Sequence, residues 1–208
     1  MDETPATVQT LLNWLQAGSI NLFGLPFAGK DTQAKLLGEL LNAPVIAGGD
    51  ILRAYPDPEK IKQLSSTGEL FPTDLYLKIV LPYLSRPEFA DKPLILSSVG
   101  RWHGEEEPVL EAAQTSGHPM MAAVSLKLDE DELWRRWEVA QEQQDRGPRY
   151  DDDKHTLEVR LEEYRNKTVP VLDAYRQLGL LVEVDGQGTT DVVTQRIINS
   201  LLGTFVNK

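Results

Sequence analysis

A lysine that follows a glycine-bounded turn is the first candidate for chemistry in this sequence. Residues 20–33 read Ile-Asn-Leu-Phe-Gly-Leu-Pro-Phe-Ala-Gly-Lys-Asp-Thr-Gln, so an apolar run enters a turn between Gly24 and Gly29. Lys30 follows, and a helix-forming stretch begins at Thr32. Strand, glycine loop and helix is the context of a phosphate-binding loop. Backbone N–H groups and the helix N-terminus would hold phosphate oxygens there, and Lys30 would reach the outer phosphates of a nucleoside triphosphate.

The match to this loop pattern is incomplete. Asp31 stands where the pattern G-x-x-x-x-G-K-[ST] has serine or threonine. For the loop taken alone, the alternative is a Gly-Lys turn that joins a strand to a helix and binds no ligand. Phosphate binding therefore also requires basic residues from elsewhere in the chain to converge on this loop.

The composition favours a globular protein and argues against a nucleic-acid partner. The chain has 208 residues, is 41% hydrophobic and 25% charged, and carries a net charge of −11 without a basic block. It contains no cysteine, which excludes disulfides and a thiolate zinc site. No apolar run suggests a membrane span and the acidic N-terminus does not resemble a signal peptide, so a cytoplasmic protein without a membrane partner is expected.

Strands are predicted to alternate with helices along the chain. The expected strands are 20–23, 44–47, 93–98, 120–128 and 180–184, and the expected helices are 5–17, 32–41, 106–115, 129–144, 156–178 and 191–202. Pro170 is expected to kink the long helix or to start a second one, and prolines and a glycine divide 55–85 into short helices. This alternation predicts an α/β fold with a mostly parallel sheet that binds ligands at the carboxyl ends of its strands.

Six segments in this order and spacing resemble the adenylate kinase family and its nucleoside monophosphate kinase relatives, over almost the whole chain after residue 19. They are 24–33 (Gly-Leu-Pro-Phe-Ala-Gly-Lys-Asp-Thr-Gln), 48–53 (Gly-Gly-Asp-Ile-Leu-Arg), 68–72 (Gly-Glu-Leu-Phe-Pro), 97–101 (Ser-Ser-Val-Gly-Arg), 148–152 with 160–164 (Pro-Arg-Tyr-Asp-Asp and Arg-Leu-Glu-Glu-Tyr), and 182–186 (Val-Glu-Val-Asp-Gly). The resemblance implies a P-loop kinase whose mostly parallel central sheet is flanked by helices. It also implies reversible transfer of the γ-phosphoryl group of Mg-ATP to a nucleoside monophosphate. AMP is the first expectation, with GMP or another monophosphate as the alternative.

The resemblance also implies the site residues. Phosphoryl transfer depends on positioning and on cations around the transferring group, and arginine grips phosphate in a bidentate manner. Catalytic roles are implied for Lys30, Arg101, Arg136, Arg149 and Arg160. ATP-binding positions are implied at Gly24, Ala28, Gly29, Lys30, Asp31, Thr32, Arg136 and Gly186. Monophosphate-binding positions are implied at Gly49, Arg53, Leu70, Arg101, Glu105, Arg149 and Arg160.

One kinase domain with two mobile parts is implied by the same resemblance. The core would comprise 19–47, 86–139 and 153–208, with a monophosphate-binding flap at 48–85 and a short lid at 140–152. A lid of this length has no room for the zinc knuckle of long-lid forms, so no zinc is expected. The helix at 5–17 precedes the usual start of the family and has no assigned role. A monomer is expected.

Six positions depart from the family pattern, at Phe27, Asp31, Gly48, Ser97, Glu105 and Ala140. Asp31 replaces a glycine, and Ser97 replaces an aspartate that usually organises the waters around Mg²⁺. Our hypothesis is that these two changes are linked, so that Asp31 approaches the same hydrated Mg²⁺ from the loop. The alternative is drift towards a catalytically weak nucleotide-binding module that acts as a sensor or scaffold.

Glu105 bears on the choice of substrate. It stands where adenylate kinases have a glutamine that reads adenine. A carboxylate accepts hydrogen bonds only, which suits the N1–H and N2–H groups of guanine better than the acceptor N1 of adenine. An acidic first turn of a helix is the competing interpretation, because carboxylates there interact favourably with the helix dipole. The sequence leaves the preferred monophosphate open.

Overall fold

A five-stranded sheet lies at the centre of the computed structural model, which describes residues 5–53, 72–143 and 153–206. Its strands are β1 (Ser19–Gly24), β2 (Val45–Ala47), β3 (Leu94–Ser97), β4 (Met120–Lys127) and β5 (Leu181–Asp185). Their order is β2-β3-β1-β4-β5, and every neighbouring pair is parallel. The prediction of a mostly parallel α/β fold is confirmed. The central strand β1 leads directly into the glycine loop.

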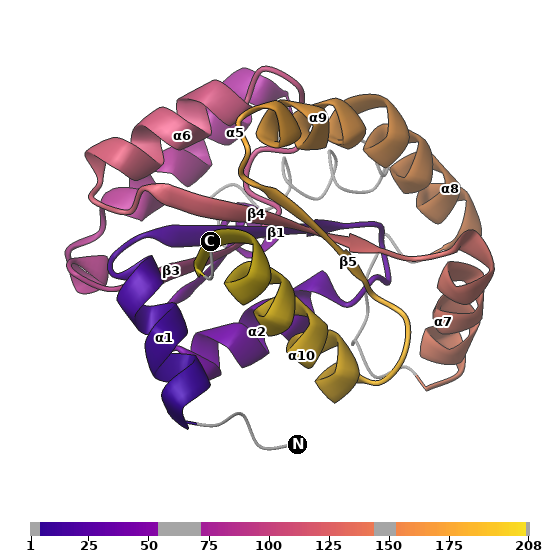
Figure 1. The fold of residues 1–208 in the computed structure, drawn as a ribbon. Helices are drawn as coiled ribbons and strands as arrows, with labels where there is room; N and C mark the ends of the chain where they lie inside the picture. Colours follow the sequence, from indigo (N-terminus) through magenta and orange to yellow (C-terminus); the bar gives the residue numbers. More distant parts are fainter. Residues whose placement is uncertain (1–4, 54–71, 144–152, 207–208) are drawn as a thin grey trace.

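Helices cover both faces of this sheet (Figure 1). One face carries α1 (Pro5–Leu15), α2 (Lys30–Leu40) and α10 (Thr190–Leu201), and the other carries α5 (Thr73–Val80), α6 (Glu106–Thr115) and α9 (Val169–Gln177). The remaining described α-helices are α3 (Gly48–Arg53), α7 (Glu130–Gln143) and α8 (Lys154–Glu163). Two short 3-10 helices, Leu81–Ser85 and Pro87–Phe89, lead into β3.

The three inner strands β1, β3 and β4 are buried on both faces, which explains their nearly continuous apolar sequences. Alternate residues of a strand enter different apolar clusters. Ile20 and Leu22 of β1 lie in the cluster with α1, α2 and α10, whereas Phe23 lies in the cluster with α5, α6 and α9. The two clusters pack against opposite faces of β1, so the loop that follows this strand starts from a fixed position.

The predicted long helix at 156–178 is in fact two helices joined by a π-helical segment, Tyr164–Thr168. Pro170 lies in the first turn of α9, so it starts a second helix and does not kink a single long one. π-helical turns often occur at functional sites because the extra residue redirects side chains. Here the segment contacts the loop after β3 through Thr168, whose hydroxyl donates to the carbonyl of Arg101 at 3.1 Å.

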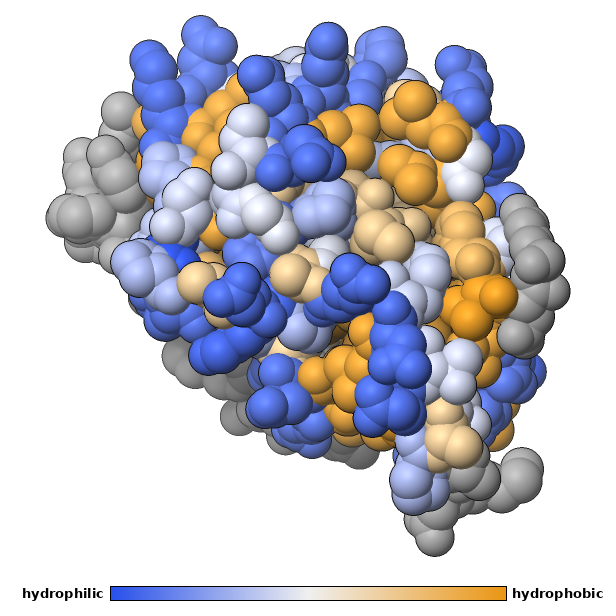
Figure 2. Space-filling view, turned by 60° about the vertical axis from the view of Figure 1, so that its left-hand side comes forward, coloured by the Kyte–Doolittle hydropathy of each residue, from blue (hydrophilic) through white to orange (hydrophobic). Residues whose placement is uncertain are grey.

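The first helix is shorter than predicted and packs against the end of the chain. It ends at Leu15 and not at residue 17, because Gln16 adopts a left-handed conformation with φ 48°. Trp14 stacks on Phe205 of a second π-helical segment, Leu202–Val206, with ring centroids 5.6 Å apart. Hydrophilic and apolar residues are interspersed on the face in Figure 2. No described helix is both long and apolar enough to cross a bilayer.

Candidate active site

The glycine loop joins β1 to α2 through two residues in the left-handed region. Gly29 has φ 84° and precedes Lys30, the first residue of α2, while Phe27 has φ 62°. A non-glycine residue in this region costs about 1–3 kcal/mol. The Phe27 side chain is buried in the cluster that contains α2 and α10, and this burial offsets the strain. An aromatic residue at this position thus anchors the loop to the core.

Three cations converge where α2 begins. Burial lowers the pKa of Lys30, the nearby Asp31 opposes this shift, and the positive charges of Arg101 and Arg160 lower the pKa further. Burial also lowers the pKa of Arg101, and Arg160 adds to that effect. Like charges held close together in a partly buried site favour the binding of a polyanion, which relieves their repulsion. The structure therefore brings together three of the predicted catalytic residues.

The two departures that the sequence linked are in direct contact. The Ser97 hydroxyl donates to Asp31 Oδ1 at 2.6 Å, and Lys30 Nζ lies 3.5 Å from Asp31 Oδ2. Ser97 ends β3 and pairs in register with Leu22 of β1, which places it beside the loop. The Asp31 side chain is 54% exposed, against 16% for Lys30. A carboxylate thus lies at the solvent side of the cation cluster.

Glu105 is buried and binds the backbone of the loop that carries Arg101. Its Oε2 accepts hydrogen bonds from the N–H groups of Arg101 and Trp102 at 2.8 and 3.0 Å. Burial raises the pKa of Glu105, and the Trp102 N–H, the Thr73 hydroxyl and the Arg101 charge oppose this shift. Glu105 is the N-cap residue of α6, and Glu106 and Glu107 form its acidic first turn, so the helix-dipole interpretation also stays open. Base reading by this carboxylate stays a prediction.

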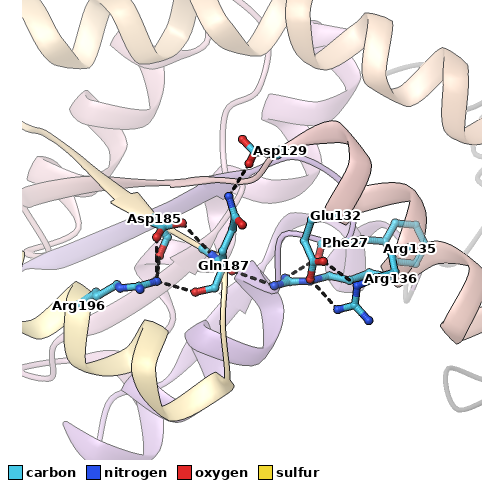
Figure 3. Close-up of polar contacts among 9 residues, drawn as sticks. Phe27, Asp129, Glu132, Arg135, Arg136, Asp185, Gln187 and Arg196 are labelled. Atoms are coloured by element: carbon cyan, nitrogen blue, oxygen red, sulfur yellow. Dashed lines mark hydrogen bonds and ion pairs between the residues drawn. The ribbon is translucent and has the colours of Figure 1, made fainter.

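A pocket of about 440 Å³ lies on the other side of the loop, and Arg136 is part of its wall. Arg136 Nε binds Glu132 Oε1 at 2.8 Å, while its other nitrogens donate to the carbonyls of Phe27 and Gly186 at 3.2 and 3.0 Å (Figure 3). The lining includes Phe27, Gly29, Thr32, Arg136, Ala140 and Gly186. The guanidinium therefore ties α7 to the glycine loop and to the loop after β5.

The loop after β5 is held by residues that the sequence did not single out. Arg196 of α10 binds the Asp185 carboxylate at 3.0 Å and also donates to the carbonyls of Asp185 and Gln187 (Figure 3). The Gln187 amide donates to Asp129 at 2.6 Å. The contact between Gln187 and Asp129 joins distant parts of the sequence. In the sequence, the segment 182–186 was the feature that pointed to this loop. These contacts fix one wall of the pocket.

The structure describes some of the other predicted site residues, and the rest lie outside the described ranges. Gly24 at the end of β1 and Ala28 in the loop are buried, whereas Thr32 on α2 and Gly49 on α3 are exposed. Leu70, Arg149 and the Arg53 side chain lie outside the described residues. Within the described ranges, no group of three or more histidine and acidic side chains could hold a metal ion.

Comparison with known proteins identifies the family. The sequence profile described as adenylate kinase matches residues 22–180. An adenylate kinase of Thermus thermophilus is 33% identical over 184 residues, which cover 86% of this chain and 94% of that protein. One from Xylella fastidiosa is 34% identical over 185 residues, which cover 86% and 97%. This chain belongs to the adenylate kinase family.

Membership of this family makes the protein an ATP-using nucleoside monophosphate kinase. The structure also gives reasons for two of the departures from the family pattern, at Gly48 and Ala140. A Cβ atom on Gly48 would lie 2.6 Å from the Tyr76 Oη, so the side chain of Tyr76 requires glycine there. Ala140 lines the pocket next to Arg136 and packs against the apolar cluster of α2 and α10. Both departures therefore have local packing partners.

Proposed function

We propose that this protein transfers the γ-phosphoryl group of Mg-ATP to AMP. The observation that carries the proposal is the convergence of Lys30, Arg101 and Arg160 beside a glycine loop that also borders a pocket of about 440 Å³. A nucleoside triphosphate needs both features, since its phosphates require cations and its nucleoside requires a cavity. The relatives at 33–34% identity are named adenylate kinases, which supports ATP and AMP as the pair.

The proposed roles follow from position. Lys30 binds the outer phosphates of ATP, with the N–H groups of the loop and of the first turn of α2 beside it. Arg101 and Arg160 bind the monophosphate and neutralise charge that develops on the transferring group. The adenosine of ATP occupies the pocket between the glycine loop, Arg136 and Gly186. A direct catalytic role for Arg136, and the roles of Arg53, Leu70 and Arg149, rest on the resemblance to the family.

Mg²⁺ accompanies ATP in this family, and the oxygen donors beside Lys30 fit such an ion. The Asp31 carboxylate and the Ser97 hydroxyl are hard oxygen donors 2.6 Å apart, and the carboxylate is partly exposed. Mg²⁺ prefers such ligands and keeps several waters, so Asp31 would hold it through water. When bound, the ion neutralises phosphate charge. The flap at 48–85 and the lid at 140–152 stay predictions, because residues 54–71 and 144–152 lie outside the described ranges.

A coupled assay with Mg-ATP and a panel of monophosphates tests the proposal. We expect kcat/KM for AMP to exceed that for GMP, CMP and UMP by about tenfold or more, because one oxygen of Glu105 is already occupied by backbone N–H groups. Glu105→Gln should lower kcat for every monophosphate, and Glu107→Gln on the exposed first turn of α6 is the matched control. A preference for GMP that Glu105→Gln reverses would overturn AMP as the substrate and assign base reading to Glu105.

A further inference from the structure

The backbone of residues 98–102, which carries Arg101, is held by side chains from several elements. Asn21 of β1 donates to the carbonyl of Val99 at 2.7 Å and accepts the N–H of Val99 at 3.2 Å. The Thr168 hydroxyl donates to the carbonyl of Arg101, and the buried Glu105 carboxylate accepts two N–H groups of the loop. All of these contacts come from the sheet, the π-helical segment or the start of α6. They hold the loop to the core.

Tyr76 binds the same loop from α5, within the segment that the family resemblance assigns to the monophosphate flap. Its Oη accepts the N–H of Gly100 at 3.1 Å and donates to the carbonyl of Ser98 at 3.4 Å. The side chain is 7% exposed, and burial raises the pKa of the phenol above its ordinary value of 10. The hydroxyl therefore keeps its proton, and one atom serves as donor and acceptor for two peptide groups on either side of Val99.

The hydroxyl also fills the space beside the start of α3. A Cβ atom on Gly48 would lie 2.6 Å from Oη but 3.4 Å from the two nearest ring carbons of Tyr76. The close approach thus involves the hydroxyl oxygen and not the ring. Because α3 packs against α5 and begins at Gly48, the hydroxyl lies where α3, α5 and the Arg101 loop meet.

We propose that Tyr76 is a positioning residue that ties Arg101 to α3 and α5. Any displacement of these two helices relative to the sheet must either break the two hydrogen bonds of the hydroxyl or move the loop that carries Arg101. Among the described residues of the predicted flap, Tyr76 binds the backbone of this loop directly, whereas Thr73 reaches it through Glu105. The inference rests on the proposed function, in which Arg101 binds the monophosphate. It predicts that Tyr76 affects the monophosphate and leaves ATP binding unchanged.

Tyr76→Phe removes only the oxygen, and steady-state kinetics with AMP and ATP varied separately measure the effect. We expect KM for AMP to rise about tenfold, because two buried peptide groups lose their partner, while KM for ATP changes less than about twofold. Tyr83→Phe is the matched control. Tyr83 lies on the neighbouring 3-10 helix, where its ring packs under Arg86. An unchanged KM for AMP, or an equal rise in both KM values, would overturn the proposal.

Gly48→Ala provides an independent test should Tyr76→Phe fold poorly. In the wild-type background the new Cβ would displace the hydroxyl, so the same rise in KM for AMP is expected. In the Tyr76→Phe background the nearest ring atoms are 3.4 Å away, so the added methyl should have little further effect. The double-mutant cycle is therefore expected to be strongly non-additive, and additive effects would refute the contact. A wild-type enzyme inactive on every monophosphate would contradict the proposed function instead.

Discussion

The two sides of the glycine loop use arginine in opposite ways. At the start of α2, Arg101 and Arg160 lie close enough to each other and to Lys30 to lower pKa values by charge repulsion. On the pocket side, Arg136 pairs with Glu132 and binds two carbonyls, and Arg196 pairs with Asp185. On the first side the neighbouring positive charges repel one another, and an entering anion relieves that repulsion; on the pocket side, Arg136 and Arg196 are each paired with a carboxylate.

Under the proposed function, this difference predicts which side takes part in phosphoryl transfer. Cations that repel one another gain most when a phosphoryl group with growing negative charge enters between them. Cations already bound to carboxylates and carbonyls have less to gain, and they hold the pocket wall in place. Carboxylates also lie near the first side, because Asp31 contacts Lys30 and the charge of Glu163 opposes the lowering of the Arg101 pKa.

Removing a cation from the first side should have the largest effect. Lys30→Met is expected to lower kcat about 10²–10³-fold with a smaller change in KM, because the lost contact strengthens in the transition state. The melting temperature should hardly change, since burial already disfavours the charge. Lys35→Met, on an exposed position of α2, is the matched control. Near-normal turnover in Lys30→Met would remove the phosphate-loop assignment.

The carboxylate on the first side should show an intermediate effect that depends on metal. Asp31→Gly is expected to weaken Mg-ATP turnover about tenfold and to tighten binding of metal-free ATP, because the carboxylate repels phosphate when no cation intervenes. Ser97→Asp should restore part of the activity in the Asp31→Gly background. In the wild-type background, Ser97→Asp should lower turnover, since it would place two carboxylates within hydrogen-bond distance of each other.

A double-mutant cycle measured as apparent Mg²⁺ affinity checks this coupling. Calorimetry with ATP in the presence of a chelator gives the metal-free arm. Strictly additive effects, or an Asp31→Gly enzyme with unchanged metal dependence, would show that the two departures are unrelated.

The pocket side should respond weakly and through stability. Hydrogen bonds from Arg135 and Arg136 lower the pKa of Glu132 from 4.5 to about 2. A carboxyl group whose pKa is lower in the folded state stabilises the fold above its unfolded pKa, and this contribution is lost as the pH falls from about 5 to 2. Glu132→Gln should lower the melting temperature by at most about 2–4 °C at pH 7, and the difference should shrink at pH 3.

Thermal melts at the two pH values measure this difference. The control is Glu138→Gln, which removes an exposed carboxylate from the same helix. A gap for Glu132→Gln that widens on acidification would mean that the pairing with the two arginines does not lower its pKa.

Local patterns explain why much of the fold could be predicted. The strand, loop and helix around Lys30 are encoded by neighbouring residues, and so are the alternation of strands and helices and the place of Pro170. The link between Asp31 and Ser97 was also accessible, because both depart from one family pattern. The resemblance could supply the chemical reason for that link, but only the structure showed that the two side chains touch.

The residues that position Arg101 could not be predicted in the same way. Asn21, Tyr76 and Thr168 belong to three distant segments, and each is an ordinary residue in its local sequence. Their convergence depends on the order of strands in the sheet. The left-handed conformation of Phe27 was hidden for a similar reason, since it depends on tertiary burial of the side chain.

The packing of α1 has a consequence for synthesis of the protein. Leu11 and Leu15 share an apolar cluster with Ile198 and Leu201, and Trp14 stacks on Phe205. At about 5–20 residues per second, translation separates the appearance of these two groups by roughly 10–40 s. Throughout that interval the first helix leaves the ribosome with an apolar face whose covering helix has not been made. This apolar face is therefore fully covered only after α10 and the segment Leu202–Val206 have been made.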